Sequence, residues 1–201
     1  MIPRELIGTA KAPGGVELKL IRHGEDHVIM VDANELMSSR LGGSEEALAV
    51  MACQRLKKGI APRLLIGGYG MGFTLRAALQ VIGPEGRATV VELVPEIIDW
   101  AKGPMAKLTD GCLDDPRVEL IQGDVLEAIK SASKQYDAIL LDVDNGPSGL
   151  VRPDMRPSSP ARGRFGASLG VAISFSAPWK VSGTRCCSMI ASFTPAQRES
   201  S

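Results

Sequence analysis

A glycine-rich segment followed at a set distance by an acidic residue has the clearest chemical meaning in this chain. Its four glycines are Gly67, Gly68, Gly70 and Gly72. Glycine lets a backbone turn sharply and approach a ligand closely. Glu92 lies 20 residues beyond Gly72, at the end of the next apolar run, where a carboxylate accepts hydrogen bonds from ribose hydroxyls. The pair predicts a nucleoside-like ligand. Tyr69, inside the turn, either packs beneath it or lies beside that ligand.

Acidic residues also follow the next two predicted strands. Asp124 comes shortly after residues 118–122, where it caps the following helix, contacts the amino group of an adenine base, or does both. Asp142 ends a strongly apolar run, and a carboxylate there can accept a proton or orient a cationic group. Asp144 fits either a substrate contact or a simple turn. Because ligands bind beyond the carboxyl ends of parallel strands, these acids and Glu92 predict one site at one edge of a sheet.

The elements that must position these residues alternate between strand and helix. Short apolar runs separated by helical segments favour buried parallel strands with helices on both faces. The sequence therefore predicts an α/β fold with a doubly wound, mostly parallel sheet of the Rossmann-like type. Strands are predicted at 63–67, 87–92, 118–122 and 136–142, and helices at 73–82, 95–102 and 125–131.

Three regions are predicted along the chain: a small β-hairpin unit at 1–42, a nucleoside-binding α/β core at 43–150, and an atypical tail at 151–201. In the first region, residues 16–20 and 28–31 have the alternating or apolar character of paired strands. Leu36 and Met37 indicate a short third strand.

A helix is predicted directly after the hairpin unit. Ser44 is its expected N-cap, and the basic, glycine-terminated run 57–59 is its expected end. Its predicted inward face consists of Leu48, Met51, Ala52 and Leu56.

Composition and charge place the chain among ordinary globular proteins. The formal net charge is zero, although residues 1–151 carry a net charge of −5 and residues 152–201 a net charge of +5. Nothing in this balance favours nucleic acid or a membrane as partner. The four cysteines form no C-x-x-C pair and no metal-type cluster, so free thiols, no metal and a cytoplasmic location are expected.

The tail has a different character from the core. It contains ten serines within residues 152–201, and only residues 169–175 indicate a strand. A doubly wound sheet normally continues with a helix and further strands at this point. The tail's abrupt shift toward Ser, Arg, Pro and Cys resembles out-of-frame translation of GC-rich DNA, and it equally fits a poorly ordered ending.

Together, these motifs resemble a known family. The glycine turn, Val90 to Leu93, Gly123 to Val125, and Tyr136 to Asp142 occur in the order seen in the spermidine synthase group of class I S-adenosylmethionine-dependent transferases. The likeness covers roughly residues 16–150, and the small β unit before the core is similar as well. It implies the class I methyltransferase fold and a role in polyamine biosynthesis.

The resemblance also implies roles for the candidate residues. The glycines would cradle S-adenosylmethionine or its decarboxylated form, used as co-substrate without a metal. Glu92 would hold the ribose, Asp124 would meet adenine, and Asp142 would be the general base toward an amine acceptor, with Asp144 near that substrate. The implied partner is a small-molecule amine or other nucleophile, and a homodimer is compatible with the family.

Two departures from the family pattern keep other functions open. Met71 stands where the family has an acid that holds the aminopropyl ammonium, and Ser44-Glu45-Glu46 replaces a Tyr-His-Glu or Tyr-Gln-Glu run. A neutral turn suits a ligand that keeps its carboxylate, so an S-adenosylmethionine-dependent methyltransferase is one alternative. A truncated, non-catalytic relic is a second. A dinucleotide oxidoreductase fits less well, because acids after the third and fourth strands are not part of that fingerprint.

Overall fold

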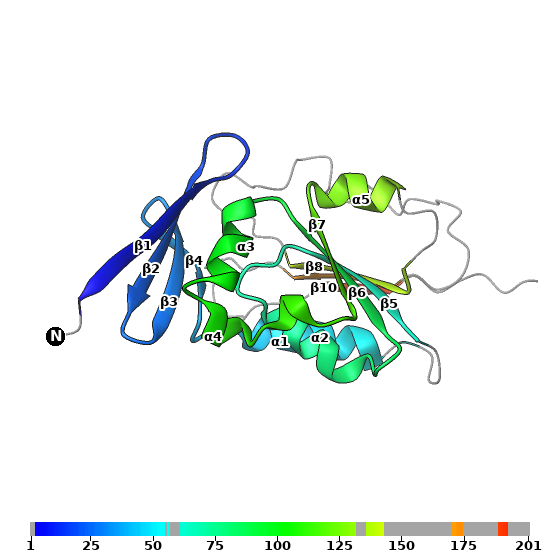
Figure 1. The fold of residues 1–201 in the computed structure, drawn as a ribbon. Coiled ribbons are helices and arrows are strands. Elements are labelled where there is room, and N and C mark those ends of the chain that lie inside the picture. The colour runs from blue at the N-terminus through cyan, green and yellow to red at the C-terminus, as the bar shows by residue number, and fades with distance from the viewer. Residues whose placement is uncertain are drawn as a thin grey trace, which may run out of the picture.

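The computed structural model describes residues 3–54, 56, 61–131, 136–142, 170–174 and 189–192. They form two sheets, one of four strands and one of six, with helices packed around the larger sheet (Figure 1). The smaller sheet stands at one end of the larger one, on the left in Figure 1. None of the helices in this described part has the length and apolar character that a membrane span requires.

The smaller sheet is a four-stranded antiparallel meander. Its strands, in spatial order, are β1 (Arg4–Lys11), β2 (Glu17–His23), β3 (Asp26–Val31) and β4 (Asn34–Ser38). The predicted hairpin is confirmed, but its strands are longer than expected because His23 pairs with Asp26. Alternate residues of β2 and β3 are buried, so one face of this sheet belongs to the core. β1 was not predicted.

The larger sheet has the doubly wound order β10-β9-β8-β5-β6-β7. All neighbouring strands are parallel except the pair β9 and β10. The strands are β5 (Arg63–Gly67), β6 (Arg87–Glu92), β7 (Val118–Gln122), β8 (Ala138–Asp142), β9 (Gly170–Ser174) and β10 (Met189–Ser192). The first three match their predicted ranges, and β8 begins two residues later than predicted. The strand order reverses between β5 and β8, which is where α/β sheets bind ligands.

Helices cover both faces of this sheet. In Figure 1, α1 (Gly43–Gln54) and α2 (Phe73–Val81) lie below it and α5 (Val125–Ser131) lies above it. The side chains accordingly form two core clusters, a large one shared with the small sheet and a smaller one beneath α5. The remaining helices are α3 (Pro95–Lys102), the short α4 (Ala106–Thr109) and the 3-10 turn η1 (Cys112–Asp114), of which only α3 was predicted.

Helix α1 differs from its prediction at its start and on its buried face. It begins at Gly43, and the amide of Glu46 donates to the carbonyl of Gly42, so Ser44 lies inside the helix instead of capping it. Leu48 and Ala52 are buried as predicted. Met51 is 40% exposed, which corrects its assignment to the core. The expected basic end at 57–59 lies outside the described residues.

One strand of the tail was predicted correctly. β9 extends the sheet beside β8 in the parallel sense, in agreement with the strand expected at 169–175. No strand was predicted from the sequence at the position of β10. The other residues of 151–201 lie outside the described part, so the hypotheses of a frameshifted or poorly ordered tail stay hypotheses.

The small sheet docks on the α/β core through a close contact at Gly8. The register of β1 and β2 shifts between Leu6 and Gly8, which places a bulge at this point. A Cβ atom at Gly8 would lie 2.7 Å from Nε1 of Trp100, a buried residue of α3. Only glycine allows the strand backbone to rest on the indole.

We expect Gly8→Ala to lower the free energy of unfolding by about 1–3 kcal/mol, the usual cost of overpacking a closed contact. Gly43→Ala is the matched control, because a Cβ atom there meets nothing within 4 Å. Alanine also favours a helix over glycine, so the control should be neutral or slightly stabilising. Urea unfolding of both variants measures the difference. A Gly8→Ala variant as stable as the control would show that this contact is not tight.

Candidate functional site

The glycine turn lies in the middle of the strand-end edge, between two strands that carry predicted site residues. Gly67, the last residue of β5, pairs with Val91 of β6 on one side and Leu141 of β8 on the other. Glu92 and Asp142 are therefore the terminal residues of the two strands that flank the turn. The backbone thus brings these predicted residues to one edge of the sheet.

The turn itself requires glycine for two different reasons. Gly68, Gly70 and Gly72 have φ angles of +87°, +55° and +77°, a left-handed region that strains other residues. Gly67 is limited by space instead, since a Cβ atom there would lie 2.7 Å from the Val125 side chain of α5. All four predicted glycines are therefore needed to shape this turn. Whether they cradle a ligand stays a prediction.

Tyr69 packs beneath the turn, which answers the question that the sequence left open. Its side chain is 3% exposed, and its hydroxyl lies 3.4 Å from the Cys112 thiol of η1. Burial raises the pKa of this phenol far above its usual value, so the hydroxyl keeps its proton. Met71 is also fully buried. The turn consequently offers backbone groups to the strand-end edge, with both of its large side chains directed into the core.

Glu92 is a buried carboxylate that joins the glycine turn to the turn after β6. Its Oε2 accepts a hydrogen bond from the Tyr69 amide and its Oε1 accepts one from the Val94 amide, each at 2.8 Å. The residue is 7% exposed. Each carboxylate oxygen has a second lone pair, so these bonds leave acceptor capacity for a ligand hydroxyl.

Asp124 caps helix α5, as one of its two predicted roles requires. Its Oδ1 accepts a 2.7 Å hydrogen bond from the Leu126 amide, and its backbone carbonyl accepts one from the Ala128 amide. The residue is half-buried at the end of β7, next to the end of β6. Its predicted contact with adenine is compatible with this capping bond.

The predicted catalytic residues lie at the edge of what the structure describes. Asp142 is the last residue of β8, and its backbone pairs with Ser174 of β9. Its position at the central strand end agrees with the sequence analysis, and its role as base stays a prediction. Asp144 lies outside the described residues.

Two residues that the sequence analysis did not assign to the site also lie at this edge. Met37 of β4 covers the glycine turn, because a Cβ atom at Gly70 would lie 2.8 Å from its thioether sulfur. Glu45, near the start of α1, is 3% exposed. A signal for Glu45 was present in the sequence, since it stands three residues before Leu48 and thus on the same face of the helix.

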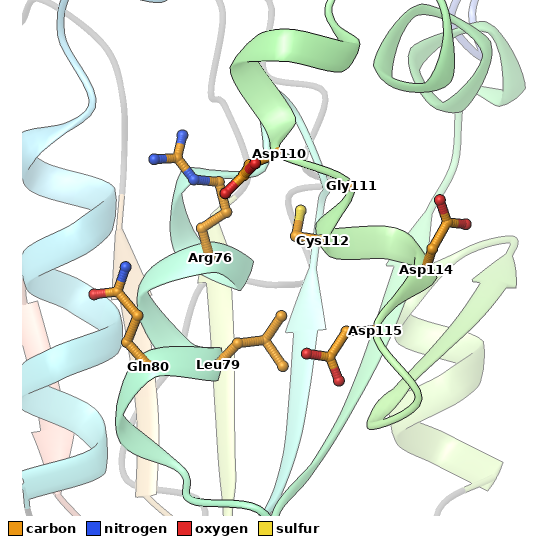
Figure 2. A pocket seen from close by; sticks show the side chains of 8 residues that line it. All are labelled: Arg76, Leu79, Gln80, Asp110, Gly111, Cys112, Asp114 and Asp115. Atoms are coloured by element: carbon orange, nitrogen blue, oxygen red, sulfur yellow. The ribbon is translucent and has the colours of Figure 1, made fainter.

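A cavity of about 410 Å³ lies beside α2 (Figure 2). It is lined by Arg76, Leu79, Gln80, Asp110, Gly111, Cys112, Asp114 and Asp115. Figure 2 shows it between α2 and the segment that carries η1.

Two of the charged groups around this cavity are bonded within the fold. Arg76 donates to the Leu108 carbonyl at 2.7 Å. Asp115 accepts hydrogen bonds from the side chain and amide of Arg117, which lower its pKa to about 2. These contacts lie within the fold, and we assign no ligand to the cavity. In the described part of the chain, no group of three or more His, Cys, Asp and Glu side chains is arranged to hold a metal ion.

The family model and the relatives that match this chain all belong to spermidine synthases or polyamine aminopropyltransferases. Residues 45–155 match the family model for the spermine/spermidine synthase domain. The polyamine aminopropyltransferase of Korarchaeum cryptofilum is 37% identical over 90 residues, which cover 45% of this chain and 27% of that protein. Polyamine aminopropyltransferase 1 of Streptomyces coelicolor is 38% identical over 81 residues, covering 39% and 15%. The matched stretch thus spans about a quarter or less of these relatives.

Solved structures show the same fold. Spermidine synthase from Thermotoga maritima matches with a TM-score of 0.55 and 21% identity, over 68% of this chain and 48% of that one. A spermidine synthase in complex with the transition state analogue AdoDATO matches equally well, over 68% and 47%. The predicted Rossmann-like, class I methyltransferase-type fold is thereby confirmed.

We expect Glu92→Ala to lower the free energy of unfolding by about 1–3 kcal/mol, because two buried amides lose their acceptor. Glu119→Ala is the control: this carboxylate lies on the neighbouring strand β7 but is exposed, and its one short contact is a 3.4 Å bond from Thr89. Chemical denaturation compares the two variants. Equal effects would contradict the role of Glu92 as the link between the two turns.

Proposed function

Because this chain belongs to the spermine/spermidine synthase domain family, we propose that it binds decarboxylated S-adenosylmethionine and transfers its aminopropyl group to an amine. The proposal concerns the matched segment, which forms the α/β core and the strand-end edge. The observation that carries it is the arrangement of Glu92 and the glycine turn. A hydrogen bond joins the Tyr69 amide to Glu92, and the turn follows β5, one of the two strands between which the strand order reverses.

In this proposal, the nucleoside lies across the ends of β5, β6 and β7. The left-handed glycines let its sulfonium portion approach the backbone of the turn. Glu92 accepts hydrogen bonds from the ribose hydroxyls with the lone pairs that its two amide donors leave free. Asp124 contacts the adenine amino group while it continues to cap α5.

The chemistry that we propose is a direct displacement. The nitrogen lone pair of the acceptor amine forms a bond to the carbon next to sulfur, and the carbon–sulfur bond breaks with its electron pair passing to sulfur. The products are an alkylated amine and a neutral thioether nucleoside. Asp142, at the end of the central strand β8, takes the proton that the amine nitrogen loses. Since the sulfonium is already a good leaving group, positioning of the amine supplies most of the rate enhancement. Asp144 would contribute to the acceptor site.

One observation supports a second candidate. The family's acid in the glycine turn is replaced by Met71, which is buried and carries no charge to the strand-end edge. A turn without that acid accepts the carboxylate of intact S-adenosylmethionine more readily. A methyltransferase with the same nucleoside placement is therefore the competing function.

Calorimetric titration with the two nucleosides separates these candidates. Tighter binding of decarboxylated S-adenosylmethionine than of the intact form is the expected result for aminopropyl transfer. A preference for the intact form would favour methyl transfer. Binding of neither would contradict both and would favour a non-catalytic core.

We expect Asp142→Asn to reduce kcat by about 100-fold or more, because an amide cannot accept the proton, while nucleoside affinity changes little. Asp137→Asn is the matched control at the opposite end of the same strand. It keeps a carbonyl oxygen for the Arg63 amide, which donates to Asp137 at 2.8 Å. Steady-state kinetics and calorimetry on both variants make the comparison. A parallel loss of turnover and nucleoside affinity in Asp142→Asn would argue against a role as base.

A further inference from the structure

The imidazole of His27, on β3, is buried without a hydrogen-bond partner. Its exposed fraction is 8%, and the alternation of β3 turns it toward the core together with Ile29 and Val31. Within the described part of the chain, neither Nδ1 nor Nε2 of this ring has a hydrogen-bond partner. A neutral imidazole tolerates such a place at some cost, whereas an imidazolium there would be an uncompensated buried charge. The position therefore favours one protonation state of the ring over the other.

β3 also holds the segment that joins the small sheet to helix α1. The His27 amide donates to Oγ of Ser39 at 3.0 Å, and the Ser39 amide donates back to the His27 carbonyl at 2.8 Å. Beside this pair, Nε of Arg40 lies 3.6 Å from Oδ2 of Asp26. Helix α1 begins three residues after Arg40, at Gly43. These three contacts form the joint between the small sheet and α1.

The joint is continuous with the cover of the glycine turn. β4 ends at Ser38, the residue before the joint, and its Met37 pairs with Ile29 of β3. Met37 covers the turn, because a Cβ atom at Gly70 would lie 2.8 Å from its sulfur. Opening of the joint would release the end of β4 that carries this side chain.

The charged groups near His27 come from β1, β2, β3, the turn between β2 and β3, and the joint. Arg22 of β2 is paired with His27 across the strands, so the two side chains share a face, and its guanidinium binds Glu5 of β1 at 2.8 Å. Burial lowers the pKa of His27, and the cation of Arg22 lowers it further. The carboxylates of Asp26 and Glu25 oppose this shift with smaller effects. His27 is therefore neutral in the folded chain near neutral pH.

We propose that His27 makes the joint acid-sensitive, so that the attachment of the small sheet to α1 weakens as the pH falls. A protonated ring cannot stay on the core face without an acceptor, and turning it toward water separates β3 from Ser39. This inference goes beyond the proposed function and does not depend on which ligand the glycine turn binds.

The direction of the effect follows from proton linkage. Above the usual histidine pKa of 6.5, the ring is neutral whether the joint is closed or open, and its titration contributes nothing. Below that value the open joint binds a proton that the closed joint excludes. The closed joint therefore loses stability as the pH falls.

Hydrogen exchange of the Ser39 amide, followed by NMR at about pH 7.5 and about pH 5.5, measures opening of the joint. The reference is the Arg87 amide, which donates to the Pro62 carbonyl at 2.8 Å, at the end of the large sheet opposite the glycine turn. We expect the protection of Ser39, corrected for intrinsic exchange, to fall by about threefold to tenfold on acidification, since one proton shifts an equilibrium by at most about tenfold per pH unit. The protection of Arg87 should change by less than about twofold.

The test variant is His27→Leu, which fills the buried position with an apolar side chain that does not titrate. His27→Met, whose flexible side chain fits irregular spaces, serves if the Leu variant does not fold. The control is His23→Gln, which removes a half-buried histidine at the end of β2. We expect the pH effect on Ser39 to vanish in His27→Leu and to persist in His23→Gln. The ring of His27 should titrate with a midpoint below 6.5 in the wild type.

Three results would overturn this inference. An equal pH effect on Ser39 in the wild type and in His27→Leu would assign the effect to another group. A titration midpoint of the His27 ring at or above 6.5 would show that the closed joint tolerates the charge. A parallel loss of protection at Ser39 and Arg87 would show unfolding of the whole chain instead of local opening. A loss confined to Ser39, and to the chains that keep His27, supports the inference.

Discussion

The geometry of the strand-end edge depends on the carboxylate of Glu92. Its two oxygens accept amides from Tyr69 and Val94, which belong to turns after different strands. A glutamine at this position would meet one of the two amides with its NH₂ group, because the Tyr69 and Val94 amides donate to different oxygens of the carboxylate. A buried charge is costly on its own, and here the two charge-assisted hydrogen bonds offset that cost. The same bonds define the shape of the ligand-facing backbone.

Contacts too close for a side chain then set the position of the N-terminal sheet relative to this edge. Gly8 meets Trp100, Gly42 meets Phe73, and Gly70 meets Met37. Each contact joins a segment before β5 to a segment after it. One of these contacts is made by Gly70 of the glycine turn itself, and the other two are made by residues that follow the turn. The small sheet therefore forms part of the surroundings of the turn. This agrees with the single core cluster that spans the small sheet and the helices α1, α2 and α3.

The sequence predicted those parts of the molecule whose signals are local. Buried strands such as 63–67 and 87–92 are short, mostly apolar segments bounded by turn residues, and their ends were located correctly. The orientation of Tyr69 could not be predicted, because its hydroxyl partner Cys112 lies 43 residues away. Glu45 was not assigned to the site, because a glutamate in the first turn of a helix is usually solvated and is stabilised there by the helix dipole. The helical spacing puts Glu45 on the face of Leu48, but the depth of its burial depends on how α1 packs against the rest of the fold.

The composition of the glycine turn has a consequence for the entropy of binding. Four of the six residues from 67 to 72 are glycine, the residue that loses the most conformational freedom when it is ordered. Here the hydrogen bond to Glu92 and the burial of Tyr69 and Met71 hold the turn in one conformation through contacts within the chain itself. The ordering penalty is therefore incurred when the chain folds. A ligand that binds at this turn meets a preorganised surface and forfeits little of its affinity to loop ordering.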